Sequence, residues 1–179
     1  MSVLRIPPKA KPFIGIFSSD RSIIDRTINI LERKLGIKDF VSNEFIFSDS
    51  DYYNEEMGSP LYRKFVSFSK LIPREKLIKI KILSDRIEKK FSIIKNSKLC
   101  RTVNIDPGIL TPESFILSTG KGYAHRIYIN RGVWLETTLI RKNGKYEKLE
   151  WTYPDYKRYE IISIIENIRI LYMKQLNGR

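Results

Sequence analysis

Apolar and polar positions along the chain follow two periods, and the changes between them divide it into strands and helices. Apolar runs at residues 12–17 and 40–47 have the length of strands. Between them, apolar residues recur at helical spacing at Ile24, Ile28, Leu31 and Leu35. Ser19 or Asp20 can cap this helix, and Gly36 can end it. The first 47 residues therefore predict a β-α-β opening.

The next part of the chain combines a polar connection, a helix and a strand. Residues 48–65 are rich in Asp, Asn, Gly and Pro, which predicts a long irregular connection. Pro73 suits the first turn of a helix. The apolar stripe of that helix is Leu77, Ile80, Ile87 and Phe91. Residues 101–106 form an apolar run that predicts a third strand, ending on Asp106 before a Pro-Gly pair.

The last part predicts a short helix, three further strands and a final helix. Thr111, Pro112 and Glu113 have the pattern of a helix start, so we expect a helix to about Ser118. Asn143-Gly144 is typical of a hairpin turn and predicts a strand over 145–151. The final helix is marked by apolar residues at helical spacing, namely Ile161, Ile164, Ile165, Ile168 and Leu171.

Residues 125–130 and 133–141 alternate in a way that predicts a β-hairpin. A three-residue loop over 130–132 would pair Ile129 with Val133, Ile127 with Leu135, and Arg126 with Glu136. This register places the isoleucines on a core-facing side. The opposite side would then collect Arg126, Tyr128, Trp134 and Glu136.

These elements predict an α+β fold with one mixed sheet of five to six strands. The order is β-α-β-α-β-α-β-β-β-α, and we expect the helices mainly on one face. We divide the chain into an N-terminal tail over 1–11 and a single domain over 12–179, which is long enough to bury a core.

Composition restricts the classes of protein that the chain can belong to. No stretch approaches the roughly 20 apolar residues that cross a bilayer, and the N-terminus lacks an apolar run like that of a signal peptide. Cys100 is the only cysteine, so an internal disulfide and a multi-cysteine zinc site are excluded. We therefore expect a cytoplasmic protein without a membrane partner.

The net charge of +13 is concentrated in one segment. Residues 63–101 hold thirteen lysines and arginines against three acids, a net charge of +10, whereas residues 39–62 hold six acids and no base. The basic segment could bind nucleic acid or phosphates, or it could lie against the acidic one. An AT-rich genome could also explain the lysine excess. The candidate nucleic-acid-binding residues are Lys76, Lys79, Arg86, Lys89 and Lys90.

Asp106 is the first candidate for chemistry. A carboxylate where a strand feeds a loop could bind a metal or act as a base. Asp before Pro-Gly is equally typical of a turn. His125 is the only histidine, and with Asp106 and Glu136 it completes the catalytic candidates. Asp106 and Glu136 are also the candidate metal ligands, with Mg²⁺ or Mn²⁺ as the cation.

A second set of residues could line a ligand pocket. Arg126 could bind a carboxylate or phosphate between the aromatic rings of Tyr128 and Trp134. The connection over 48–65 adds further candidates, namely Tyr52, Tyr53 and Arg63. The alternative is that these aromatic residues only pack, and that Arg126 and Glu136 form an ordinary cross-strand ion pair.

Six runs resemble one bacterial family, domain of unknown function 4416. They are FIGIFSSD (13–20), DYYNEEMGSPLYRKFVSF (51–68), VNIDPGILT (103–111), HRIYI (125–129), ETTLI (136–140) and WTYPDYK (151–157). The family has no established activity, so the resemblance implies no catalytic residue. A phosphate-binding P-loop is absent, because STGKGY (118–123) lacks its first glycine and its Ser/Thr.

Three functions remain open from the sequence. The favoured one is a binding protein for a phosphate-bearing partner, either RNA or a nucleotide. The first alternative is a metal-dependent phosphoester hydrolase, and the second is a protein-interaction module without a catalytic site.

Overall fold

The structure is a computed structural model, and it describes residues 3–48 and 51–178. In that part of the chain, the helices are α1 (Arg21–Leu35), α2 (Asn54–Met57), α3 (Leu77–Phe91) and α4 (Tyr159–Asn177). The strands are β1 (Lys11–Ser18), β2 (Lys38–Val41), β3 (Phe45–Phe47), β4 (Leu61–Phe68), β5 (Ile93–Lys95), β6 (Lys98–Cys100), β7 (Asn104–Leu110), β8 (Ser114–Thr119), β9 (Ile127–Asn130), β10 (Val133–Lys142) and β11 (Lys145–Lys148). Three short 3-10 turns are η1 (Asp51–Tyr53), η2 (Arg74–Lys76) and η3 (Asp155–Lys157).

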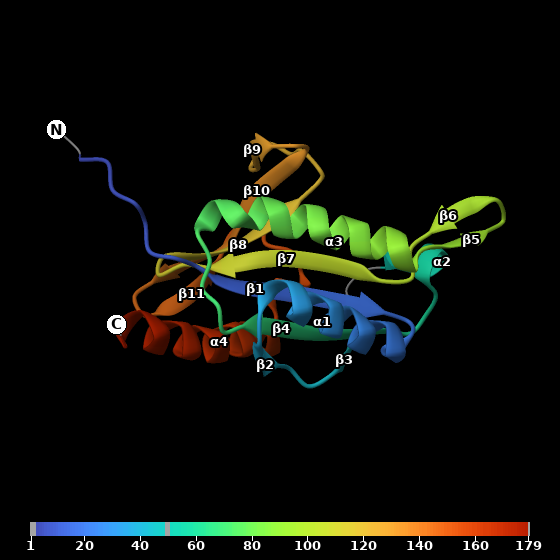
Figure 1. The fold of residues 1–179 in the computed structure, drawn as a ribbon, viewed down its shortest axis with the longest axis horizontal. Coiled ribbons are helices and arrows are strands. Elements are labelled where there is room, and N and C mark those ends of the chain that lie inside the picture. Colours follow the sequence, from blue (N-terminus) through green and yellow to red (C-terminus); the bar gives the residue numbers. More distant parts are fainter. Residues whose placement is uncertain (1–2, 49–50, 179) are drawn as a thin grey trace.

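The fold is α+β, as predicted, but the sheet is larger and simpler than expected. Nine of the described strands form one sheet in the order β11-β10-β8-β7-β1-β4-β2, with β3 on β4 and β9 on β10. Every pairing is antiparallel, so the prediction of a mixed sheet of five to six strands is wrong. Figure 1 shows β1 and β7 side by side at the centre.

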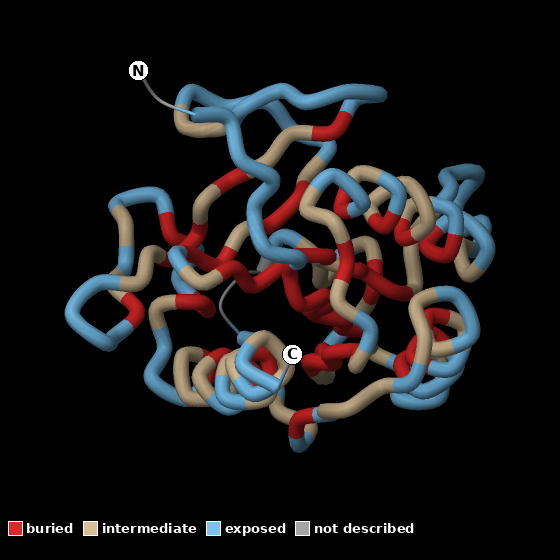
Figure 2. The backbone as a smooth tube through the Cα atoms, turned by 60° about the vertical axis from the view of Figure 1, so that its left-hand side comes forward, coloured by how far each residue is buried: buried red, intermediate tan, exposed pale blue. Residues whose placement is uncertain are grey.

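Helices cover both faces of the sheet, which corrects the expectation of one covered face. Ile14 and Ile16 of β1 pack in a core with α1 and α3. Phe13 of the same strand packs in a second core with α4, because successive side chains point to opposite faces. In Figure 2 the buried positions gather at the centre, and the peripheral hairpins are exposed.

Several predicted elements are confirmed. Asp20 caps α1 by accepting a hydrogen bond from Ser22 N at 2.8 Å, and the helix ends at Gly36 with φ +102°. The helix after Pro73 and the final helix are present as α3 and α4. Asn143-Gly144 forms the turn before β11, both residues having positive φ.

The predicted helix over 111–118 is wrong, because this segment is a turn followed by β8. Thr111 Oγ1 does accept a hydrogen bond from Ser114 N, at 3.0 Å, as an N-cap residue would. Thr111 N in turn donates to Ser114 O at 2.9 Å, which closes a tight turn. The hydrogen bond that a helix cap would make therefore stabilises a turn between β7 and β8 instead.

The connection over 48–65 is more ordered than predicted. It contains η1, α2 and the start of β4, the strand that pairs with β1 along its length. The predicted strand over 40–47 is divided into β2 and β3, which both pair with β4. The β5–β6 hairpin was not predicted either, and its turn residues Asn96 and Ser97 have positive φ.

The hairpin of β9 and β10 has a shorter loop than predicted. Asn130 pairs with Val133, which leaves two loop residues, and a register shift then brings Ile127 opposite Leu135. The pairing of Ile129 with Val133 is therefore wrong. Ile127 and Ile129 are 69% and 42% exposed, so they do not face a core.

No helix in the described part of the chain is both long and apolar enough to span a membrane. The division into a tail over 1–11 and one domain over 12–179 stays a prediction, although β1 begins at Lys11.

Candidate functional site

Asp106 lies inside a strand and does not end one. β7 pairs with β1 from Asn104 to Leu110, but it pairs with β8 only from Gly108 to Leu110. The pairing with β8 ends at Gly108, and the preceding residue, Pro107, has no backbone N–H to donate. The interpretations of Asp106 as a strand-end or turn residue are therefore wrong. It occupies the part of β7 whose edge toward β8 is open.

A glycine allows two charged side chains to meet across a strand. β1 lies between β4 and β7, and Gly15 pairs with Phe65 on one side and Asp106 on the other. Arg63 Nη2 lies 3.5 Å from Asp106 Oδ2. A Cβ on Gly15 would lie 3.1 Å from Arg63 Nη2 and 2.9 Å from Phe65 Cε1. Gly15 therefore provides the space in which Arg63 crosses β1.

Arg63 is 1% exposed, and its charge is balanced by acids. Its Nη1 donates to Asp155 and its Nη2 donates to the Tyr156 hydroxyl at 3.1 Å. The guanidinium also lies 4.8 Å from the centre of the Phe65 ring. Burial raises the pKa of Asp155, and the positive charge of Arg63 opposes that rise. Arg63 Nε is buried and has no hydrogen-bond partner among the described residues. Such an atom is rare in a folded protein and calls for an explanation.

A pocket of about 680 Å³ opens beside Arg63 and the free edge of β7. This volume is within the range of about 300–1,000 Å³ that is typical of small-molecule sites. Its aromatic walls are Phe17, Phe47, Tyr52, Tyr53, Tyr153 and Tyr156. Its basic residues are Arg63, Lys81, Arg101 and Lys121. Its acidic residues are Asp85, Glu88, Asp106, Glu136 and Asp155.

Glu88 of α3 takes the place of β8 at the free edge. Its Oε1 accepts a hydrogen bond at 2.6 Å from Ile105 N, a residue that has no partner in β8. Burial raises the pKa of Glu88 to about 7, with a smaller rise from Asp106, while Lys81, the Ile105 N–H and Arg101 oppose it. A carboxyl group that titrates near neutral pH therefore lines the pocket.

A chain of polar contacts joins α2 to β7. Arg101 donates from Nη2 to Glu56 Oε2 at 2.7 Å and from Nη1 to Asn104 Oδ1 at 2.8 Å. Asn104 Nδ2 then donates to Asp106 Oδ1 at 2.9 Å. The hydrogen bonds from Arg101 lower the pKa of Glu56. Next to them, burial raises the pKa of Tyr53 to about 12, so this phenol stays a hydrogen-bond donor.

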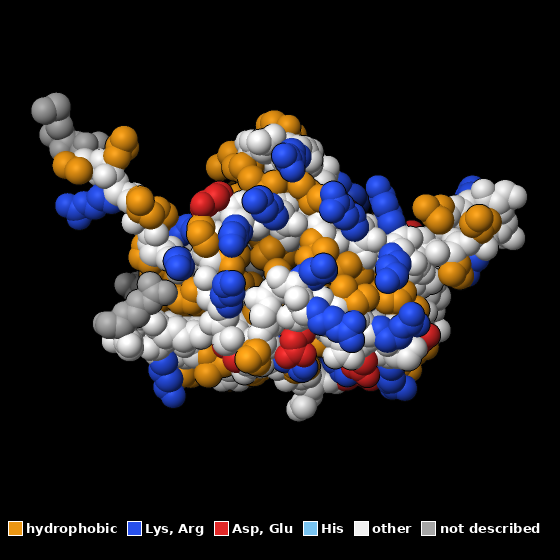
Figure 3. Space-filling model, viewed as in Figure 1, with side chains coloured by type: hydrophobic (Ala, Val, Ile, Leu, Met, Phe, Trp, Pro, Cys, Tyr) orange, Lys and Arg blue, Asp and Glu red, His pale blue; other side chains and the backbone are white. Residues whose placement is uncertain are grey.

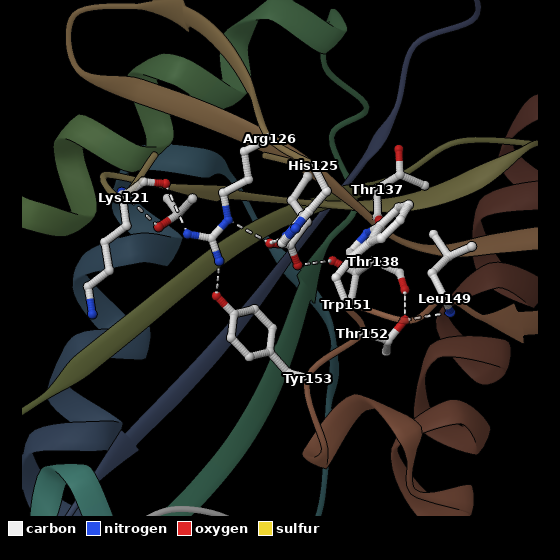
Figure 4. A network of polar contacts seen from close by, with 11 residues as sticks. Lys121, His125, Arg126, Thr137, Thr138, Leu149, Trp151, Thr152 and Tyr153 are labelled. Carbon is white, nitrogen blue, oxygen red and sulfur yellow. Dashed lines mark hydrogen bonds and ion pairs between the residues drawn. The ribbon is translucent and has the colours of Figure 1, made fainter. Parts of the chain in front are cut away.

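Glu136 of β10 is 1% exposed and is held by residues of the preceding loop. Arg126 Nε donates to Glu136 Oε2 at 2.8 Å, and His125 Nε2 lies 3.1 Å from the same oxygen. The predicted ion pair of Arg126 with Glu136 is thus confirmed. The predicted strand pairing of Arg126 with Glu136 is wrong, because Arg126 precedes β9, whose ladder with β10 ends at Ile127 opposite Leu135. Figure 4 shows Arg126 reaching toward the Tyr153 hydroxyl and the Lys121 carbonyl, to which it also donates. These contacts hold Glu136 in place in the pocket lining, next to residues of β8.

The structure divides the predicted site residues into two groups. Those that line the pocket are Asp106, Glu136, Tyr52, Tyr53 and Arg63. His125 and Arg126 are not part of the pocket lining but contact Glu136, which is part of it. The His125 ring stacks on Trp151 with the ring centres 5.0 Å apart. Tyr128 and Trp134 form a ring pair of their own on β9 and β10 and are not part of the pocket lining, so the predicted grip of Arg126 between their rings is wrong.

The five candidate nucleic-acid-binding residues lie on α3 and on η2 before it, and all are exposed. They are Lys76, Lys79, Arg86, Lys89 and Lys90. Figure 3 shows lysine and arginine side chains spread over the face on which α1 and α3 lie. None of the five forms an ion pair with a described residue, so the idea that they lie against the acidic segment is wrong for them.

The candidate metal ligands have other partners. Asp106 contacts Arg63 and Asn104, and Glu136 contacts Arg126, His125 and Thr138. Among residues 3–48 and 51–178, no group of three or more His, Cys, Asp or Glu side chains has an arrangement that could hold a metal ion. The shared Mg²⁺ or Mn²⁺ stays a prediction that no contact supports.

Sequence reasoning missed several pocket residues, namely Glu88, Arg101, Lys121, Tyr153 and Asp155. A signal existed for Glu88, because it follows Ile87 and lies four residues after Ser84 on the buried stripe of α3. A carboxylate on an apolar stripe is unusual and indicates a buried partner or a site.

A family model described as Domain of unknown function (DUF4416) matches residues 8–172. The chain belongs to this family. The resemblance expected from the six sequence runs is thereby confirmed. No curated protein and no solved structure matches the DUF4416 chain.

Five of the six runs that indicated the DUF4416 family contribute to the pocket lining. They are 13–20, 51–68, 103–111, 136–140 and 151–157. The sixth, 125–129, begins with His125 and Arg126, which hold Glu136. Runs that are far apart in the sequence therefore meet at one place in the fold, and this place is the candidate functional site.

Proposed function

We propose that this DUF4416 protein binds a nucleotide, or a similarly small phosphate-bearing molecule, in the pocket beside β7. The observation that carries the proposal is that one pocket combines tyrosine rings with Lys121, a cation without an ion pair among the described residues. A nucleotide needs both features, since it joins a flat base to a charged phosphate.

The base would lie against the aromatic wall. Tyr52 and Tyr153 are 67% and 40% exposed, so their rings are accessible to a ligand. Stacking of a base on an aromatic side chain contributes about 1–3 kcal/mol to binding. Asp106, at the same wall, can accept hydrogen bonds from the amino group of a base.

The phosphate would lie near Gly120 and Lys121, which follow β8. No atom lies within 4 Å of the place of a Cβ on Gly120, so a ligand can approach this backbone closely. Lys121 Nζ lies 5.0 Å from the centre of the Tyr52 ring, at the junction between the two parts of the ligand. A lysine attracts phosphate as a compact point charge.

Calorimetric titration with ADP and GDP tests this proposal. We expect both wild type and the control Lys145→Glu, which changes the charge at an exposed position of β11, to bind one of these nucleotides. Lys121→Glu should bind it at least tenfold more weakly. The proposal fails if neither nucleotide binds the wild type, or if Lys121→Glu binds as tightly as the control.

A second candidate function is RNA binding by the outer face of α3. It is favoured by the five exposed cations on this face, which have no ion pair with any described residue. Such a surface attracts a phosphate backbone without reading its sequence. The two functions use different surfaces and can be separated by mutation.

A further inference from the structure

We propose that Glu88 is the general base of a hydrolytic site in this pocket, and that the phosphate-bearing ligand is its substrate. The inference rests on the proposed ligand pocket and adds a reaction to it. The observation behind it is the position of the Glu88 carboxylate, which accepts a backbone hydrogen bond and also lines the pocket.

One oxygen of Glu88 is fixed by the fold. Oε1 accepts the hydrogen bond from Ile105 N at 2.6 Å. Oε2 accepts no hydrogen bond from any described residue, although Glu88 is 8% exposed and lines the pocket. A base works best when its orientation is fixed and one lone pair remains available to the reacting proton. Glu88 meets both conditions.

The surroundings of Glu88 suit proton transfer near neutral pH. Burial keeps its pKa near 7, where a carboxylate is a much stronger base than an exposed glutamate. The charged groups that act on it come from three places, namely Lys81 on α3 itself, Asp106 on β7, and Arg101 before β7. The two cations can also stabilise negative charge that develops on a substrate.

The reaction is a hydrolysis. A water molecule beside Oε2 gives its proton to Glu88 while its oxygen forms a bond to the phosphorus atom. The bond between phosphorus and the leaving oxygen breaks, and the leaving oxygen keeps the electron pair and takes a proton from solvent. Glu88 then returns its proton to solvent. One water is consumed, and the products are phosphate and the remainder of the ligand.

Glu88 also has a structural role, because it satisfies the Ile105 N–H at the free edge of β7. Two variants separate the roles. Glu88→Gln keeps an acceptor oxygen for Ile105 N but cannot take up a proton, whereas Glu88→Ala loses both properties. Glu75→Gln changes an exposed glutamate of η2 and serves as the matched control.

The test is phosphate release from ADP, GDP, ATP and GTP with Mg²⁺ present, followed by phosphorus NMR over a range of pH. For wild type and Glu75→Gln we expect turnover that rises with pH through about 7, as Glu88 loses its proton, and then levels off. Glu88→Gln should bind the nucleotide as wild type does and lose at least a hundredfold in turnover.

Three results would overturn the inference. Nucleotide that binds the wild type without any phosphate release would remove the reaction and leave the binding function intact. Turnover by Glu88→Gln at the wild-type rate would assign Glu88 to structure alone. A wild type that binds none of the four nucleotides would overturn the binding function together with the reaction.

Discussion

At the scale of single residues, Gly15 is the position on which the charged centre of the site depends. The side chain of Arg63 crosses β1 at Gly15 to reach Asp106. Arg63 and Phe65 leave no room for a side chain at this position. We expect Gly15→Ala to displace Arg63 and Phe65 and to lower the free energy of unfolding by about 1–3 kcal/mol, the usual effect of overpacking. Urea denaturation measures this change.

Gly120→Ala is the control, because a Cβ there would have no atom within 4 Å. Its free energy of unfolding should stay close to that of wild type. Equal stabilities for Gly15→Ala and Gly120→Ala would mean that Arg63 and Phe65 adjust without cost, and that the crossing at Gly15 is not a tight constraint.

Asp106 shows why single residues of the site could be named from the sequence but not placed. Asp-Pro-Gly is typical of a turn, and the local preference was real. β7 continues through it because β1 pairs with this whole stretch, and because Gly108 fits against β8, where a Cβ would lie 2.7 Å from the Ile116 carbonyl oxygen. The extended conformation at Asp106 is thus set by contacts with β1 and β8, and the local sequence pattern carries no information about these contacts.

At the scale of elements, the helices could be predicted better than the strands. α1, α3 and α4 each carry an apolar stripe of their own, so their period is visible in the sequence. β4 was missed because Arg63 and Lys64 interrupt its apolar positions, and Arg63 is buried only because Asp155 and Asp106 come to it from other elements. β8 was missed because the turn before it contains the same side-chain hydrogen bond as a helix N-cap, from Ser114 N to Thr111 Oγ1.

The exposed cations on the outer face of α3 and on η2 carry the proposed RNA binding. Reversing Lys76, Lys79, Arg86 and Lys89 to Glu should abolish RNA binding, since each lost phosphate contact removes a counterion-release contribution. Binding of a single-stranded RNA by wild type should be weak and should fall steeply as salt rises. Fluorescence anisotropy at several salt concentrations measures both effects.

The matched control reverses four exposed cations elsewhere, namely Arg131, Lys145, Lys148 and Lys174. It changes the net charge equally and leaves α3 untouched. If both sets of changes weaken binding to the same degree, the attraction comes from net charge and no RNA site exists on α3. No binding by wild type at low salt would favour genome composition as the source of the lysine excess.

At the scale of the whole molecule, the site is a product of topology. Arg63, Asp106 and Glu136 were all candidates from the sequence, yet nothing local indicated that β4, β7 and β10 would present them to one pocket. β1 pairs with the whole of β7, whereas β8 pairs only with its end from Gly108 to Leu110, and this difference creates the opening. Glu88 enters the site only because α3 covers that edge.

Amide chemical-shift mapping during separate titrations with ADP and GDP tests whether this opening is the ligand site. We expect the largest shifts at Ile105 and Asp106 and at the loop of Gly120 and Lys121, with small shifts over the exposed face of α3. Shifts confined to α3 around Lys79 and Arg86, or no shifts with either nucleotide at millimolar concentration, would show that this opening is not the ligand site.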